Sequence, residues 1–317
     1  MIEVVPGIHR IETKLDGNLL CLHVLRGERT LLIDSGMHDT PATTIYPALA
    51  AAGMPEQIDL LLISHADAHH HGGNAAIRAR SPHATIMCHE FDRRRVETKE
   101  HYLRARYDDV VAADDVRYPP DLMARLSDAL GPDTPVDVGL RGGETIWLGQ
   151  DMRYEVIHAP GHSAGHLAVW DRVRRVLIVQ DAVLWRGVPN LRGKVPSPPS
   201  YYYAGAYIDS VRRLKGLEPE LLLAAHFPVI RGAEVAAFFA TSLAFVEKVD
   251  QAVLDAVRGA ERPLPLSAVI EAIDARLGPF STPVEWVGAV LAHLSQHVAA
   301  RRLSVRSTDS GRVWEVA

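Results

Sequence analysis

The chain has 317 residues, of which 47% are hydrophobic and 23% are charged, a composition that excludes disordered, collagenous and coiled-coil proteins. Lysine and arginine number 34 against 39 aspartate and glutamate residues, so the overall charge argues against nucleic acid or an anionic membrane as a general partner. Two cysteines are too few for a secreted disulfide framework. The N-terminus lacks the apolar core of a signal peptide and no apolar run approaches the roughly 20 residues of a membrane span, so we expect a cytoplasmic protein.

The first ninety residues predict strands and helices in alternation. Gly27-Glu28 is a turn signal between two apolar runs, which predicts paired strands. Thr40-Pro41 starts an Ala-rich segment that Gly53 ends, which is typical of a capped helix. The predicted strands lie at 18–24, 29–34, 59–64 and 85–88, and the predicted helices at 40–52 and 72–80.

The middle of the chain predicts an insertion followed by a second sheet. Residues from about 90 to 139 are charged and only patchily periodic, which indicates a helical insertion or lid. Beyond them, short apolar runs are separated by Gly, Asp and Pro. The predicted strands lie at 145–148, 153–157, 167–170, 176–180 and 220–225, and the predicted helices at 207–214 and 236–257.

The C-terminal sixty residues predict a small separate domain. Residues 258–265 are the best linker candidate because they contain Gly259, Pro263 and Pro265. Thr282 to Glu285 combines an N-cap residue, a proline and a glutamate, which predicts a helix to about Ala300. A helix, this capped helix and a hairpin over 303–316 form a winged-helix-like pattern. We therefore predict domains at 1–257 and 258–317.

Histidine is the informative residue type, because the chain has 16 and they cluster. Imidazole and carboxylate groups suit Zn²⁺, Fe²⁺ or Mn²⁺. The first cluster follows a predicted buried strand and precedes Gly72-Gly73, so its side chains can converge on one point. A solvated histidine-rich loop is the alternative. The clusters are His65, His69, His70 and His71, and then His158, His162 and His166.

The first cluster, in the segment from Ser64 to Gly73, resembles the His-x-His-x-Asp-His motif with its following glycines in the metallo-β-lactamase-fold superfamily. Four further landmarks occur in the order of that family over about residues 7–232. They are Asp34 in Leu-Leu-Ile-Asp-Ser-Gly, His162 in Ala-Pro-Gly-His, Asp181 in Val-Gln-Asp-Ala and His226 in Ala-His-Phe-Pro. The resemblance implies an α/β fold of the αββα sandwich type, in which two mixed β-sheets are flanked by helices, plus the winged-helix-like tail.

The sequence departs from the family within the first motif, where Asp67 stands in the place of the second histidine and His69 in the place of the aspartate. The motif therefore reads His-x-Asp-x-His-His, and the total of five histidines and two aspartates is unchanged. By the resemblance, one metal is held by His65, Asp67 and His162, and the other by His69 or Asp67, His70, Asp181 and His226, with Asp181 bridging. We expect two Zn²⁺ ions per chain, while the two-His-one-carboxylate set leaves Fe²⁺ or Mn²⁺ open.

The resemblance implies a hydrolase in which metal-activated water attacks an ester, lactone, thioester or amide carbonyl of a small organic substrate. Asp181 and Asp67 are the expected catalytic carboxylates, Asp67 as a group that holds or accepts the proton of the water. Asp34 and His166 are candidates for orienting the ligands, with turn capping and core packing as their alternatives. The candidate substrate-binding residues are Trp185, Tyr201, Tyr202 and Tyr203, for each of which packing is the alternative. His71 is expected to face solvent.

Three other functions remain open at this point. A mononuclear iron oxidoreductase of the persulfide dioxygenase type would use His65, His162 and Asp181. A nucleic-acid-processing hydrolase would use the tail, but its seven arginines over 251–317 are balanced by seven acidic residues, whereas a DNA-reading domain should be basic. A metal-free binding protein is the third. We expect a small-molecule substrate and no nucleic-acid or membrane partner, and a homodimer is an alternative to the monomer.

Overall fold

A computed structural model describes residues 1–15, 17–149 and 152–317. Its first sheet has seven strands in chain order, antiparallel from β1 to β4 and parallel from β4 to β7. The strands are β1 (Ile2–Val5), β2 (Ile8–Leu15), β3 (Asn18–Arg26), β4 (Thr30–Ile33), β5 (Leu60–Leu62), β6 (Thr85–His89) and β7 (Val138–Leu140). β1 and β2 precede the first strand that the sequence predicted.

The second sheet has six strands in the order β13-β12-β11-β10-β9-β8, with one parallel pair between β11 and β12. Its strands are β8 (Thr145–Trp147), β9 (Arg153–His158), β10 (Leu167–Asp171), β11 (Val176–Ile178), β12 (Leu221–Leu223) and β13 (Ile230–Arg231). Both sheets are thus mixed, as predicted.

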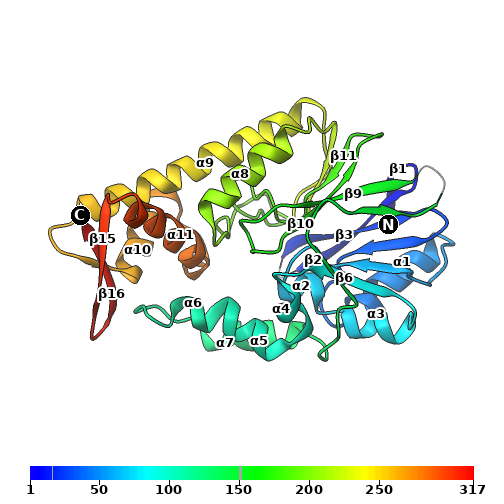
Figure 1. The fold of residues 1–317 in the computed structure, drawn as a ribbon, viewed down its shortest axis with the longest axis horizontal. Coiled ribbons are helices and arrows are strands. Elements are labelled where there is room, and N and C mark those ends of the chain that lie inside the picture. The colour runs from blue at the N-terminus through cyan, green and yellow to red at the C-terminus, as the bar shows by residue number, and fades with distance from the viewer. Residues whose placement is uncertain (16, 150–151) are drawn as a thin grey trace.

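The two sheets pack face to face because their strands are apolar on both sides. In β4, Leu31 and Ile33 join the core between the sheets, and Leu32 between them joins the core beneath the outer helices. Alternate side chains of a strand point to opposite faces, so a strand buried on both faces reads as an unbroken apolar run. Helices cover the outer faces of both sheets (Figure 1). The predicted αββα sandwich is confirmed.

The helices over the first sheet are short. The predicted helix at 40–52 occurs as η1 (Pro41–Ile45) and α1 (Tyr46–Ala51), and the helix predicted at 72–80 as α3 (Asn74–Arg80), preceded by one turn, α2 (Ala68–His71). The insertion is helical. It contains α4 (Arg93–Glu97), α5 (Lys99–Leu103), η2 (Arg104–Asp108), α6 (Asp109–Val111) and α7 (Pro120–Ala129).

The tail shares a hydrophobic core with the second sheet. α8 (Ala204–Lys215) and the long α9 (Ala233–Arg258) cover this sheet, and α9 also packs against α10 (Leu266–Leu277) and α11 (Trp286–Ala299). Buried side chains from all four helices belong to one continuous cluster. The division between 257 and 258 stays a prediction. None of the helices in the described ranges combines the length and the apolarity that a membrane crossing needs.

The tail ends in a three-stranded sheet of order β14-β16-β15. Its strands are β14 (Leu264–Pro265), β15 (Leu303–Thr308) and β16 (Gly311–Val316), and the short η3 (Pro283–Glu285) precedes α11. The predicted helix, second helix and hairpin are therefore present, while assignment to the winged-helix fold stays a prediction. The predicted side-chain cap of Thr282 does not form.

The tip of the insertion contacts the tail. The Arg312 guanidinium of β16 donates from Nε to Asp114 Oδ1 at 2.9 Å and from Nη2 to Asp114 Oδ2, and the Ser267 N–H donates to Asp115 Oδ1 at 3.1 Å. Figure 1 shows the row of helices α5, α6 and α7 reaching from the first sheet toward β16. The tip of the insertion is thereby joined to the tail.

We predict that Leu294→Ala, a change at a fully buried position of α11, lowers the free energy of unfolding by about 2–5 kcal/mol. Because the tail and the second sheet share one core, urea unfolding should still show one transition by fluorescence and circular dichroism. Val305→Ala, on the exposed side of β15, is the control and should change stability by no more than about 0.5 kcal/mol. A separate early transition confined to the tail would contradict the shared core.

Candidate metal centre

Seven side chains from four loops meet at one edge of the sandwich. His65 and Asp67 follow β5, His69 and His70 lie on α2, His162 follows β9, Asp181 follows β11 and His226 follows β12. Short parallel strands at the centre of each sheet end at this edge, so the loops that leave them converge. The structure brings together every residue that the sequence predicted as a metal ligand, in two adjoining groups.

The first of these, the four-residue group, consists of His69, His70, Asp181 and His226. Their candidate ligand atoms all lie within 4.8 Å of one another. His69 Nε2 is 3.3 Å from His226 Nε2, and Asp181 Oδ2 is 3.2 Å from His70 Nε2 and 3.4 Å from His226 Nε2.

Buried atoms without partners show that the four-residue group fits a cation. Within the described residues, His70 Nε2 and Asp181 Oδ1 are buried and have no hydrogen-bond partner. Burying such atoms unpaired is costly, and native structures rarely leave them so. Three imidazoles and one carboxylate are the donor set that a tetrahedral Zn²⁺ site uses.

The three-residue group consists of His65, Asp67 and His162. His162 Nε2 lies 2.9 Å from Asp67 Oδ2, and His65 Nε2 lies 3.6 Å from the same oxygen. His65 Nε2 is also 3.6 Å from Asp181 Oδ2, so the two groups adjoin through Asp181.

Arg106, in η2 of the insertion, is the functional residue that the sequence analysis missed. Its Nε donates to Asp67 Oδ1 at 2.8 Å and its Nη2 to Asp67 Oδ2 at 2.9 Å. Its Nη1 donates to the His162 carbonyl at 3.3 Å, and the guanidinium lies 4.1 Å from the centre of the Tyr202 ring. No motif surrounds Arg106 in the sequence, and its role depends on the folding of the insertion back over the first sheet.

The surroundings keep the two carboxylates ionised. Burial raises the pKa of Asp67, but Arg106 and then His162 outweigh it and hold the pKa well below its ordinary value. Burial likewise raises the pKa of Asp181, and His226 and His70 bring it well below its ordinary range. Both side chains are therefore anionic at neutral pH.

The surroundings also keep two of the imidazoles neutral. Burial and the neighbouring His70 hold the pKa of His65 and of His69 well below the ordinary value. A neutral imidazole has the free ring lone pair that ligation requires. Both side chains can therefore bind a cation at neutral pH.

Hydrogen bonds on the far ring nitrogens orient the imidazoles. His65 Nδ1 donates to Ser64 Oγ at 2.9 Å, and His162 Nδ1 donates to the Ser200 carbonyl at 2.5 Å. His226 Nδ1 donates to the Leu19 carbonyl at 2.7 Å. These bonds turn each Nε2 toward the centre, as the backbone and carboxylate partners of metal-binding histidines do.

Asp34, at the end of β4, lies where the resemblance placed it. It accepts hydrogen bonds from His70 Nδ1 at 2.7 Å, from the Ser64 N–H at 2.7 Å and from Ser64 Oγ at 2.9 Å. Gln180, which stands where the family usually has glycine, also donates to Asp34 Oδ2. The orienting contact proposed for Asp34 is thus present, whereas no sequence pattern indicated the part played by Gln180.

A second buried carboxylate, Asp92, joins the two histidine loops. It accepts hydrogen bonds from Ser163 Oγ at 2.6 Å, from the Gly165 N–H at 3.2 Å and from the Ala66 N–H at 3.3 Å.

Gly161 lets the His162 loop lie against α8. Its φ is +145°, and a Cβ at this position would lie 2.4 Å from Tyr207 Cα, so only glycine fits there.

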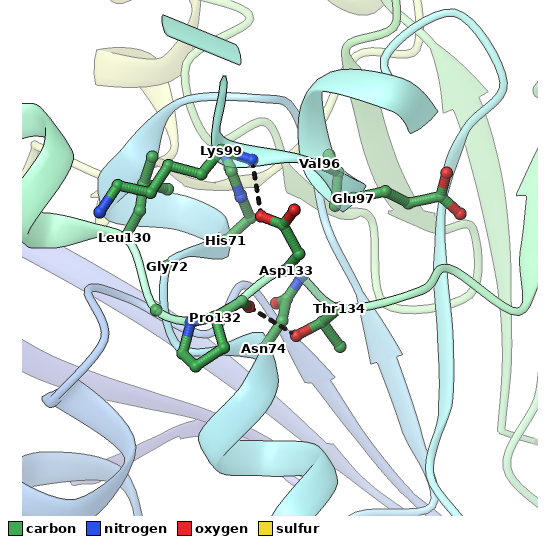
Figure 2. A pocket seen from close by; sticks show the side chains of 11 residues that line it. His71, Gly72, Asn74, Val96, Glu97, Lys99, Leu130, Pro132, Asp133 and Thr134 are labelled. Atoms are coloured by element: carbon green, nitrogen blue, oxygen red, sulfur yellow. Dashed lines mark hydrogen bonds between the residues drawn. The ribbon is translucent and has the colours of Figure 1, made fainter. Parts of the chain in front are cut away.

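His166 and His71 occupy core positions. His166 stacks on His65 with ring centres 4.8 Å apart, and neither of its ring nitrogens has a partner within the described residues, so packing is the contact that it makes. His71 is buried beside Tyr102, so the expectation that it faces solvent is wrong. Figure 2 shows His71 in the wall of a small pocket where the Lys99 N–H donates to Asp133 at 2.9 Å.

The four aromatic candidates separate into different environments. Tyr202 lines the large cavity into which the metal centre opens. Tyr201 is fully buried, where it stacks on Tyr207 and bonds to His293, so it supports its loop instead of contacting substrate. Tyr203 is 44% exposed, and Trp185 is half-buried against the core with Arg186 over its ring.

This cavity has a volume of about 1180 Å³ and borders both ligand groups. Its walls come from the N-terminal hairpin, the insertion, the loop after β11 and the tail. The residues that line these walls include Asn18, Tyr107, Tyr118, Leu191, Tyr202 and Glu285. The cavity is slightly larger than most small-molecule sites and mixes aromatic, apolar and charged side chains, as such sites do.

Comparison with known proteins identifies the family. The sequence profile of the Metallo-beta-lactamase superfamily matches residues 19–226, a segment that contains the seven predicted ligands. The chain belongs to the metallo-beta-lactamase superfamily. It is accordingly a metallo-hydrolase, as the sequence predicted.

Individual relatives agree with this assignment. The probable metallo-hydrolase YflN of Bacillus subtilis (strain 168) is 25% identical over 240 residues, which cover 71% of this chain and 85% of YflN. The structure of a metallo-beta-lactamase family protein from Thermus thermophilus superposes with a TM-score of 0.76 at 18% identity, over 99% of this chain and all of that one. The structure of a beta-lactamase domain protein from Burkholderia ambifaria superposes with a TM-score of 0.72 at 20% identity, over 99% of this chain and 94% of that one. These two structures share the fold over almost the whole chain, tail included.

We predict that Asp34→Asn weakens metal binding by about 10- to 100-fold, because loss of the carboxylate frees the His70 ring. Competition with a chromophoric chelator measures the dissociation constant. Asp59→Asn is the matched control, since the Asp59 carboxylate accepts the Thr30 N–H at the opposite end of β4. Wild-type affinity in the Asp34→Asn protein, with an unchanged circular dichroism spectrum, would contradict the orienting role.

Glu285, in the cavity wall, should make stability depend on pH. Burial raises the pKa of Glu285 above 4.5, against hydrogen bonds from Ser197 and Thr282 that lower it. The folded state then binds more protons than the unfolded state, so this group makes the protein less stable as pH rises from its unfolded to its folded pKa.

Glu285→Gln should remove that contribution, so the variant gains stability relative to wild type as pH rises through this window. Urea unfolding from pH 4 to 8 measures the difference. Glu271→Gln, exposed on α10, should follow the wild-type profile. A constant difference between the Glu285→Gln protein and wild type across the range would show that Glu285 does not titrate differently on folding.

Proposed function

We propose that the protein is a zinc-dependent hydrolase that cleaves an ester, lactone, thioester or amide bond of a small organic substrate with metal-activated water. The observation that carries the proposal is the four-residue group, with its unpartnered His70 Nε2 and Asp181 Oδ1, at the floor of a large cavity. His69, His70, Asp181 and His226 would hold the ion. A bound zinc ion supplies a water of lowered pKa and polarises the carbonyl of the substrate.

The residues of the chain prepare the site for this reaction. Asp181 has one oxygen within 3.6 Å of His65, His70 and His226, so it is the carboxylate placed to fix the geometry between the two groups. Arg106 takes both oxygens of Asp67 and lowers its pKa. A carboxylate so paired is a weak base, which favours a positioning role for Asp67 over the proton-accepting role that the sequence suggested.

The cavity walls favour a medium-sized organic substrate with an aromatic or apolar part. Tyr107 and Tyr118 stand on one side with Tyr202, and Leu184 and Val188 stand on another. Burial raises the pKa of Tyr107 and of Tyr118 well above the ordinary value. Their hydroxyls therefore stay protonated at neutral pH and can donate hydrogen bonds to a carbonyl oxygen of the substrate.

The arrangement favours hydrolysis over the other functions considered. An iron centre of the dioxygenase type would take Asp181 with His65 and His162, whereas here the shortest contacts of Asp181 are with His70 and His226. Small-molecule hydrolysis is also favoured over nucleic-acid processing because the tail contributes Ser281, Thr282 and Glu285 to the cavity wall, and none of these three is basic. Zinc as the metal and homodimer formation stay predictions.

Removal of metal should abolish activity. We expect the chelator-treated protein to lose hydrolysis of a panel of esters, lactones, thioesters and amides, and zinc to restore it. His69→Ala and His226→Ala should each lower kcat/KM by at least about 100-fold, because each removes a ligand. His83→Ala, at an exposed position after α3, is the control. Full activity in the metal-free protein would refute the proposal.

A further inference from the structure

The Arg106 guanidinium lies against the three-residue group, where the family places one of its two metal ions. We propose that Arg106 stands in for that ion, so that the protein holds one divalent metal ion, in the four-residue group, and the three-residue group stays free of metal. The inference deepens the proposed function, on which it rests for the ion in the four-residue group.

The contacts of Arg106 involve Asp67 and His162, two of the three ligands that a second ion would need, and leave His65 Nε2 without a hydrogen-bond partner in the described residues. Asp67 Oδ2 is the oxygen that faces both His65 and His162, and it already accepts a hydrogen bond from Arg106 Nη2 at 2.9 Å. The same Nη2 lies 3.5 Å from His162 Nε2. Zinc binds oxygen and nitrogen ligands at about 2.0–2.2 Å, so an ion bonded to both atoms would lie within a few ångströms of the guanidinium. Repulsion between the two cations opposes this position.

Arg106 is held in this place from several sides. It is 4% exposed, it makes a bidentate pair with Asp67, and its guanidinium lies over the Tyr202 ring. Its Nη1 donates to the carbonyl of His162, one of the three ligands that it faces. A guanidinium does not lose its proton in proteins, and a bidentate buried pair is costly to break. The arginine is therefore a permanent cation of the site.

The charges of the two groups differ accordingly. The carboxylate of Asp67 is already neutralised by Arg106. The salt bridges of Asp181 within the described residues are made with histidines, which a metal ion can bind as neutral ligands. A dication thus meets one carboxylate not paired with an arginine in the four-residue group and none in the three-residue group.

The exchange between Asp67 and His69 follows from the same arrangement. A histidine at position 67, as in the family motif, could not accept two parallel hydrogen bonds from a guanidinium, whereas a carboxylate matches that fork. A histidine at position 69 gives the other group a third imidazole in place of a second carboxylate, and this group keeps four ligands. The two substitutions together keep a complete ligand set in one group and leave an anion for Arg106 in the other.

Counting and locating the bound ions tests this proposal. The metal-free full-length chain is incubated with excess Zn²⁺, desalted and measured by elemental analysis, and anomalous diffraction locates the ions. We expect one ion per chain in wild type, bound by the four-residue group. Arg106→Met removes the charge and keeps an apolar side chain, so the three-residue group should gain an ion, with an affinity at least about ten-fold above that of wild type.

Two further variants make the count specific. Arg125→Met removes an arginine that lines the same cavity and pairs with Asp121, and should leave one ion. Adding His65→Ala to Arg106→Met should return the count from two to one. If Arg106→Met does not fold, the anomalous map of wild type decides, because a peak between His65, Asp67 and His162 overturns the proposal and its absence beside a peak in the other group supports it.

The remaining outcomes separate this inference from the proposed function. Two ions in wild type, or one ion in a folded Arg106→Met protein, overturn the inference and leave the hydrolase proposal intact. A wild-type protein that binds no ion overturns both.

Discussion

The candidate metal centre depends on one buried carboxylate, Asp34. It lies at the end of β4, is fully buried, and accepts hydrogen bonds from the loops that follow β5 and β11, which belong to different sheets. Because a buried carboxylate needs several donors to offset its loss of hydration, these loops have one low-energy arrangement relative to each other. That arrangement turns His70 toward Asp181 and brings the two sheets to a common edge.

The insertion and the tail complete a site that the sandwich alone leaves open. The insertion supplies Arg106 and three tyrosines to the cavity wall, and its tip is paired to the tail through Asp114 and Arg312. The tail also supports one of the candidate metal ligands indirectly, through the loop that contains Ser200 and Tyr201. Tyr201 bonds to His293 of α11 at 2.9 Å, and the adjacent Ser200 carbonyl accepts a hydrogen bond from His162 Nδ1. The position of His162 is thus coupled to the packing of α11.

The two ligand groups show how neighbouring charges divide similar residues between different roles. Each group contains an aspartate and at least two histidines. In one, the carboxylate faces only imidazoles among the described residues, and in the other it faces a guanidinium as well as two imidazoles. The difference comes from the insertion, a part of the chain with no metal ligand of its own in the described residues. Residues outside the motif therefore decide what the motif can bind.

The sequence by itself determined the fold class, the seven histidines and aspartates that come together, and the place of Asp34. Strand ends, glycines and histidine spacing are local features that can be recognised in a single sequence. It also indicated the tail, whose helices and hairpin have strong local signals. Only the tertiary structure decided that Tyr201 and His71 lie in the core, that Glu285 lines the cavity in place of capping a helix, and that Arg106 meets Asp67 across 39 residues. These contacts depend on how the insertion and tail fold back over the sheets, and the pairing of residues far apart in the chain leaves no periodicity or spacing that a single sequence could reveal.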